Sequence, residues 1–200
     1  MRRTVVYILV GILLGIYIGT NVLEYDFLQP SIASKILRFH VLANSDSVGD
    51  QEVKEKVRDA VGVYLQPLLA GADSLEETKQ IIGENMEGIE TISRQTLKEY
   101  GYDYPVKVCI TRTDFPEKSY GAYTFPKGEY EALQISIGEA AGQNWWCVLY
   151  PNMCFRGSVF EVVEEAAGQA LREVLNPWEY ADVFDSGEVE VRFKFLEFFR

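Results

Sequence analysis

The feature that most constrains this chain is an uncharged apolar run near its start. The run covers residues 5–19 and follows Arg2 and Arg3. A short basic segment followed by such a run is typical of a secretory signal peptide or an N-terminal signal anchor. Counted on to Leu23, the run is 19 residues long, close to the roughly 20 that cross a bilayer as a helix. The sequence therefore predicts export, and both cleavage after the run and retention in the membrane stay open.

Export divides the chain into two parts. The positive-inside rule leaves the two arginines in the cytoplasm and the residues from about 24 onward outside. We expect a signal peptide or signal anchor over residues 1–29 and a single extracytoplasmic domain over residues 30–200. Contact with the membrane is expected only through residues 4–23, and only if this segment is uncleaved. A buried core helix is the weaker alternative, because no charged residue marks a solvent-facing side.

The charge of the chain excludes several classes of partner. Acidic residues number 30 against 19 basic ones, and the formal net charge is -11. The first thirty residues hold two of each sign, so the whole excess lies on the exported part. Proteins that bind nucleic acid or anionic membrane surfaces need basic patches, which argues against both partners here. The chain has one histidine, which leaves no His-rich metal site and few routes to general acid–base catalysis at neutral pH.

Three cysteines, Cys109, Cys147 and Cys154, belong to the exported part. Thiols outside the cytoplasm tend to oxidise, and Pro151-Asn152 lets the chain turn back between Cys147 and Cys154. A disulfide over so short a loop would stabilise the domain by roughly 2.5 kcal/mol. Two separate buried thiols are the alternative. Cys109 lies in an apolar strand pattern, which indicates a packed thiol.

Changes of hydrophobic period along the exported part predict an α+β domain. We expect one mainly antiparallel or mixed sheet packed with three main helices. The turn Pro126-Lys127-Gly128 is expected to join two strands as a hairpin, and the polar run N-S-D-S at 44–47 is expected to cap the first helix. The expected strands are 35–43, 106–113, 119–125, 130–138, 145–150 and 188–199, and the expected helices are about 50–69, 74–100 and 158–175.

Catalytic candidates are few. His40, with Ser45 and Asp46 nearby in the sequence, is the one group that suggests a general base. A histidine flanked by apolar strand residues is also typical of a structural hydrogen-bonding residue. No G-x-S-x-G surrounds the serine. Asp46 with Asp50 does not match a calcium loop. Helix capping accounts for this run of short polar residues. We therefore predict no catalytic residue and no metal site.

Two adjacent tryptophans, Trp145 and Trp146, follow Gln143 and Asn144 where a loop enters a strand. Neighbouring strand residues point to opposite faces, so only one of the rings can enter a given core. The other ring is expected either to lie under a second layer or to form an exposed aromatic anchor for a partner. Stacking on carbohydrate would have the same pattern.

Three segments carry a family signature. They are LRFHVLANSDSVGDQEVKEKVRDAV (37–61), GEYEALQISIGEAAGQNWWCVLYPNMCF (128–155) and RFKFLEF (192–198). In this order they resemble the stage II sporulation protein R family. The resemblance implies a signalling protein that is made in the forespore of endospore-forming bacteria and exported into the space between the two septal membranes. There it triggers a membrane-embedded aspartic-type protease of the mother cell, which processes the pro-sigma-E transcription factor. The family-matching positions are His40, Asn44, Ser45, Asp46, Asp50, Lys56, Arg58, Asp59, Gly142–Cys147 and Cys154.

Residues and resemblance together predict a non-enzymatic ligand of that protease, with no cofactor. The acidic exported part predicts a basic patch on the partner. Two alternatives stay open: an exported cell-wall hydrolase built around His40, and a wall-binding module that uses Trp145 or Trp146. The candidate partner-binding residues are His40, Asn44, Ser45, Asp46, Asp50, Arg58, Gln143, Asn144, Trp145 and Trp146, and Cys147 with Cys154 is the candidate disulfide.

Overall fold

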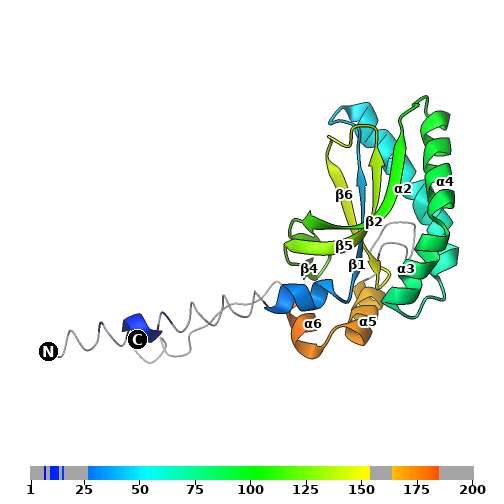
Figure 1. The fold of residues 1–200 in the computed structure, drawn as a ribbon. Coiled ribbons are helices and arrows are strands. Elements are labelled where there is room, and N and C mark those ends of the chain that lie inside the picture. The colour runs from blue at the N-terminus through cyan, green and yellow to red at the C-terminus, as the bar shows by residue number, and fades with distance from the viewer. Residues whose placement is uncertain (1–6, 8–9, 14, 16–26, 154–163, 185–200) are drawn as a thin grey trace.

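A four-stranded mixed sheet forms the centre of the protein (Figure 1). The computed structural model describes residues 7, 10–13, 15, 27–153 and 164–184. The strand order is β2-β5-β1-β6, in which β1 pairs parallel with β5 and antiparallel with β6, and β5 pairs antiparallel with β2. The strands are β1 (Leu37–Leu42), β2 (Val106–Phe115), β5 (Gly128–Ile137) and β6 (Asn144–Tyr150), and β3 (Lys118–Tyr120) pairs with β4 (Tyr123–Phe125) as a separate two-stranded ribbon.

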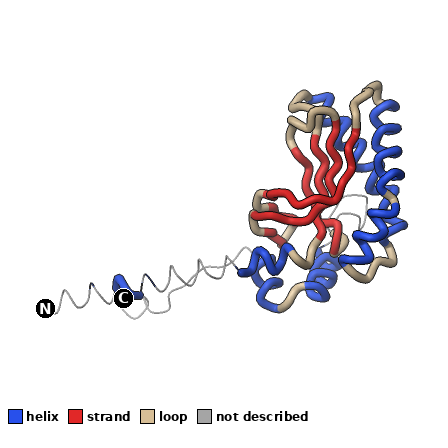
Figure 2. The backbone as a smooth tube through the Cα atoms, in the orientation of Figure 1, coloured by secondary structure: helices blue, strands red, loops and turns tan. Residues whose placement is uncertain are grey.

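Helices lie along one face of this sheet and at its lower end (Figure 2). One face packs against α2 (Val48–Leu69), α3 (Leu75–Glu84) and α4 (Met86–Glu99), which share an apolar core with β1, β5 and β6. At the lower end, the other face packs against α5 (Glu164–Val174), α6 (Pro177–Val183) and a helical segment at residues 27–33. A mixed sheet with helices confirms the predicted α+β class.

The central strand β1 is buried on both faces. Leu37, Phe39 and Val41 point into the core beneath α2–α4 and have no exposed area. Arg38 and His40 alternate with them and point to the other face of the sheet, where they are 0% and 2% exposed. We call the side chains packed on that face the second layer. Side chains of successive strand residues leave opposite faces, so a strand with cover on both sides buries all of them.

The second layer holds the Arg38 guanidinium among aromatic rings. Its central carbon lies 4.5 Å from the ring centre of Phe115, 5.1 Å from that of Tyr130 and 5.2 Å from that of Phe125. Nη2 donates to the Tyr120 hydroxyl at 3.1 Å, and within the described residues Nε and Nη1 have no hydrogen-bond partner. Burial lowers the pKa of Arg38. Cation–π attraction therefore offsets part of the cost of burying this charge.

His40 lies in the same layer. Its ring stacks on Trp146 at 4.9 Å between ring centres and lies 5.3 Å from that of Phe115. Nε2 is 3.0 Å from the side-chain oxygen of Gln134, and Nδ1 has no hydrogen-bond partner among the described residues. Burial lowers the pKa of His40, and the nearby Arg38 charge lowers it further. The ring is therefore neutral in the folded protein at neutral pH.

Most of the predicted elements are confirmed, with boundaries shifted by a few residues. The first strand is β1, and the first helix begins at Val48 with Ser47 as its N-cap, as the polar run 44–47 predicts. The strand predicted at 188–199, the first part of the helix predicted from 158, and Cys154 lie outside the described residues. Most of the segment 1–29 also lies outside the described residues. Among the helices that are described, none has the length and apolarity to cross a membrane.

The predicted hairpin between 119–125 and 130–138 is wrong. The part of the first segment that forms β4 pairs with β3, across a turn in which Gly121 has a φ of 59°. The second segment, β5, pairs with β2 and β1 instead. The turn at 126–128 does not form a hairpin. Both edges of β5 are paired with β1 and β2, which are longer than β4.

The single helix predicted over 74–100 is wrong as well, because it breaks at Asn85. This residue has φ -112° and ψ 12°, ends α3 and precedes α4. Its side chain donates to the Ile81 carbonyl at 2.8 Å and accepts from the Tyr64 hydroxyl of α2 at 3.0 Å. A short polar side chain that bonds the backbone competes with helical continuation.

The helix α6 was not predicted. Asn176-Pro177 ends the preceding helix, as predicted, and also begins α6, because the Asn176 side chain accepts from the backbone of Trp178 and Glu179, each at 3.0 Å. Proline in the first turn suits a helix start, since its missing N–H would have no partner there.

Replacing His40 by Phe should flatten the dependence of stability on pH between 7 and 5. The folded pKa lies below the 6.5 of an unfolded histidine. The stabilisation is therefore complete above pH 6.5 and is lost as the pH falls toward the folded value, by up to about 1.4 kcal/mol per pH unit. Urea unfolding of wild type and His40→Phe in mild detergent measures this difference, and the carboxylates titrate alike in both. Parallel pH profiles would contradict the assignment.

Candidate partner-binding site

Two loops that carry most of the candidate residues meet at one edge of the sheet. One loop, residues 43–47, follows β1, and the other, residues 138–143, follows β5. Because β1 and β5 are parallel neighbours, their carboxyl ends lie side by side. The backbone joins the loops directly, since Ala141 N donates to Asn44 O at 3.2 Å and Gly142 N donates to Ala43 O at 3.0 Å. We call residues 43–47 and 138–143 the two-loop site.

The Asp50 carboxylate organises the first loop from the start of α2. One oxygen accepts from Asn44 Nδ2 at 2.9 Å and from Ser45 Oγ at 2.5 Å, and the other accepts from the Tyr104 hydroxyl at 3.1 Å. Asp50 is 4% exposed, and its own N–H donates to the capping oxygen of Ser47. The hydrogen bonds from Ser45 and Asn44 lower the pKa of Asp50, so the group is a carboxylate at neutral pH.

Further polar contacts tie the second loop to the first. Asn44 Oδ1 accepts from Glu139 N at 3.0 Å, and Asp46 Oδ1 accepts from Gln143 N at 2.7 Å. The ammonium of Lys54, a residue that is 5% exposed, donates to the Gln143 carbonyl at 3.2 Å. Burial lowers the pKa of Lys54. The two family-matching segments therefore meet in space, where one holds the other in place.

Two glycines permit this close approach. A Cβ on Gly142 would lie 2.2 Å from the backbone oxygen of Ser45. Gly138 has a φ of 58°, and a Cβ there would lie 2.2 Å from Asn44 Oδ1. Neither distance is possible for real atoms, so the spacing of the loops requires glycine at both positions.

The tryptophan pair faces two different cores. Trp145 contacts Phe39 edge-on at 5.5 Å between ring centres, and the Arg58 guanidinium lies 5.1 Å from its ring centre. Trp146 packs on His40 and, at 4.6 Å, on Phe115. Both side chains are half-buried. The structure thus places each ring against a different layer of the domain, as the alternation of strand side chains requires.

The structure does not join His40 with Ser45 and Asp46. His40 bonds Gln134 within the second layer, whereas Ser45 donates to Asp50 and Asp46 accepts from Gln143. Within the described residues, no group of three or more His, Cys, Asp or Glu side chains is arranged to hold a metal ion. The geometry matches the interpretation of His40 as a structural hydrogen-bonding residue.

The other candidates divide into buried and accessible groups. Asn44, Ser45 and Asn144 are half-buried, and Arg58 pairs with Asp59 at 2.6 Å. Asp46 and Gln143 are exposed at the tip of the two-loop site, beside exposed Ser47, Glu139 and Ala141. Val48, which sequence reasoning missed, is 75% exposed there. Its signal was an apolar residue at a helix start that does not belong to the buried stripe of α2.

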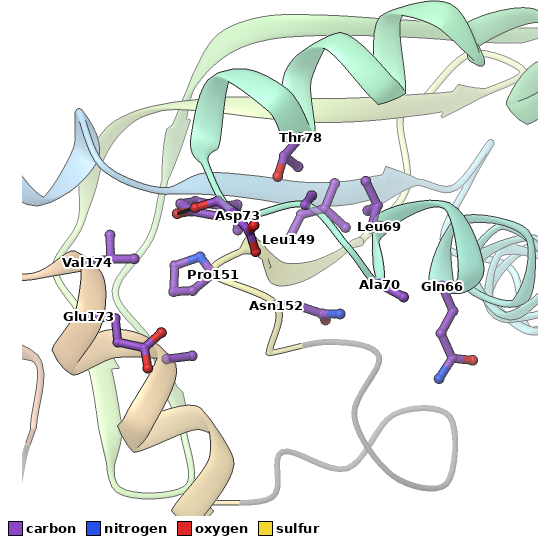
Figure 3. Close-up of a pocket in the computed structure, with 13 residues that line it drawn as sticks. Gln66, Leu69, Ala70, Asp73, Thr78, Leu149, Pro151, Asn152, Glu173 and Val174 are labelled. Atoms are coloured by element: carbon purple, nitrogen blue, oxygen red, sulfur yellow. Dashed lines mark hydrogen bonds between the residues drawn. The ribbon is translucent and has the colours of Figure 1, made fainter.

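A polar cleft near the sheet lies elsewhere. It has a volume of about 400 Å³ and is bounded by the end of α2, the start of α3, the end of β6 and α5 (Figure 3). Asp73, Thr78, Pro151 and Glu173 are among its lining residues. None of the candidate partner-binding residues lines it. Because β6 runs antiparallel to β1, this cleft is at the opposite end of the sheet from the two-loop site.

Replacing Asp50 by Asn should destabilise the domain by about 2 kcal/mol at pH 7, because hydrogen bonds to a charged group are lost and an amide donor faces three donors. The folded pKa lies below the ordinary 3.8. The carboxylate's contribution is therefore complete above pH 3.8 and is lost as the pH falls toward the folded value. Urea unfolding at pH 7, 5 and 3 measures both effects, with Glu52→Gln on the exposed side of α2 as the control. Equal stabilities of Asp50→Asn and Glu52→Gln at pH 7 would contradict this role.

Comparison with known proteins places this chain in a family. The family model described as stage II sporulation protein R matches residues 33–159, which include the whole two-loop site. The chain is 32% identical over 179 residues to stage II sporulation protein R of Bacillus subtilis (strain 168), and the match covers 86% of this chain and 77% of that protein. No solved structure matches the chain significantly. The chain belongs to the stage II sporulation protein R family, and its role is in sporulation.

Proposed function

We propose that this protein is an exported sporulation signal that activates a membrane-embedded aspartic-type protease by binding to it. The protease belongs to the mother cell and processes pro-sigma-E, and the signal reaches it from the forespore through the space between the two septal membranes. Family membership and the apolar run at residues 5–19 support this proposal. The observation that carries it is the two-loop site, whose buried polar groups bond one another while its tip stays exposed.

The internal bonding of the two-loop site suits a ligand. Loops that are already ordered lose little conformational entropy when they bind, so more of the contact energy appears as affinity. An activating ligand must also prefer the active state of its receptor, because equal binding to both states shifts nothing. A fixed arrangement of Asp46, Val48 and Gln143 can discriminate between two receptor shapes better than a loop that adapts to both.

Binding rather than catalysis is also favoured by the burial of the ionisable groups. His40 is 2% exposed and is held among aromatic rings, so a substrate would have to displace the second layer to reach it. The carboxylate of Asp50 is occupied by three side-chain donors. The hydrolase candidate that is accessible, Asp46, is not joined to His40, so among the described residues it has no partner for general acid–base work.

The net charge of -11 adds a long-range component to the proposed encounter. A basic surface on the protease would be attracted to the acidic domain, and added salt would slow association more than it speeds release. Salt dependence of activation therefore reports on the encounter, whereas the exposed tip of the two-loop site sets the specificity.

Replacing Val48 by Glu should lower activation at least tenfold, which corresponds to about 1.4 kcal/mol of binding energy. The measurement is precursor cleavage by the reconstituted protease after addition of the full chain. Val63→Glu is the matched control, because Val63 is 60% exposed on the same helix and lies about 22 Å further along it. Equal losses in both variants would indicate a general effect of charge, and full activity of Val48→Glu would overturn the assignment of the contact surface.

Export predicts one free thiol per chain. Cys109 is a free thiol on β2, whereas the Cys147–Cys154 pair is expected to be oxidised. Thiol labelling of the exported protein in denaturant should modify one cysteine before reduction and three after it, and Cys109→Ser should leave none before reduction. Three labelled thiols without reductant would contradict the disulfide.

A further inference from the structure

The end of the domain opposite the two-loop site is built from two short helices. Residues 27–33 precede β1, and α6 lies beside them (Figure 1). Glu179 of α6 has no exposed area and accepts from Lys35 Nζ at 2.5 and 2.8 Å and from Ser31 Oγ at 2.5 Å. Burial alone would raise the pKa of Glu179, but these hydrogen bonds outweigh it and lower the pKa. This ion pair, in which Glu179 is buried and the Lys35 side chain is 32% exposed, links α6 to the segment that precedes β1.

Two large aromatic side chains project from this pair of helices. Trp178 is 80% exposed, the highest value among the large apolar side chains of the described residues, and Phe27 is 72% exposed. Trp178 adjoins Glu179, and Phe27 is one helical turn before Ser31 and hence on the same side of its helix. Both rings therefore belong to the two segments that the ion pair links. We call this surface, residues 27–34 with 177–184, the aromatic end.

The aromatic end differs in charge from the rest of the molecule. Residues 27–34 contain no charged side chain, although the chain has a net charge of -11. In α6 the glutamate is buried in its ion pair, which leaves Asp182 as the other acidic residue there. Exposed aromatic rings on a nearly neutral surface suit an apolar or interfacial partner, because water solvates them poorly.

The sequence brings the aromatic end close to the apolar run. The run extends from residue 5 to Leu23, and only residues 24–26 separate it from Phe27. Four steps of at most about 3.6 Å each allow a separation of about 14 Å. A run that lies in a bilayer therefore holds Phe27 near the bilayer surface. Tryptophan is enriched at that depth, because its ring is apolar and its N–H is polar.

We propose that the aromatic end lies on the bilayer that holds the N-terminal run, with Trp178 inserted into the interfacial layer. This contact is additional to residues 4–23, and it does not depend on anionic lipid. The strand β1 begins at the aromatic end and leads to the two-loop site, so the bound domain presents that site to the opposite side. The proposal rests on the proposed export with the run retained in the membrane but not on the protease, so the two can fail separately.

The test is quenching of tryptophan emission by brominated lipid. The full chain is reconstituted in phosphatidylcholine vesicles with and without bromine on the acyl chains. Of the three tryptophans, Trp145 and Trp146 are half-buried at the far end of the sheet. Bromine should quench wild type, and the loss of emission should fall at least threefold in Trp178→Phe. An equal loss in the two proteins would overturn the proposal.

Two further measurements keep the result unambiguous. Trp178→Phe should melt at the temperature of wild type, because the ring that it replaces is exposed. Trp178 emission that is blue-shifted but unquenched, and that depends on the ratio of protein to lipid, would mean that a second copy of the chain covers the ring. That outcome would also overturn the proposal.

Discussion

The structure depends on one strand that is buried on both faces. β1 has hydrogen-bonded neighbours on both edges, helices over one face and aromatic rings of other strands over the other, so five of its six side chains are buried. One layer covers them with aliphatic residues, and the other does so with aromatic rings around Arg38 and His40. Residues 27–34 of the aromatic end precede β1, and the first loop of the two-loop site follows it. The placement of β1 therefore fixes these two ends of the molecule relative to each other.

At the carboxyl end of β1, the Asp50 carboxylate holds the loop after β1 in place. It lies where the positive end of the α2 dipole favours an anion, and it bonds two residues of the loop after β1 and one tyrosine that precedes β2. The family-matching polar residues thereby separate into two kinds. Asn44, Ser45 and Asp50 build the scaffold, whereas Asp46 and Gln143 remain accessible at its tip.

The features that local sequence determines were predictable from the sequence. The periods of 2 and 3.6 located β1, β2 and α2, and the alternation of strand residues required the two tryptophans to face different layers. The errors concern contacts between distant residues. The Tyr64 hydroxyl helps Asn85 to end α3, and longer strands displace the expected hairpin partner of β5. The pairing of the two loops also depends on β1 and β5 being parallel, which no local pattern specifies.

The central place of β1 has a mechanical consequence. A pull between the chain before β1 and the loop after it acts along the strand axis. The hydrogen bonds to β5 and β6 lie across that axis, so they are strained together in shear rather than opened one at a time. If the domain were anchored at its aromatic end and bound at its two-loop site, tension between the two would act along β1. The sheet resists force best in that direction, so the loops would keep their shape.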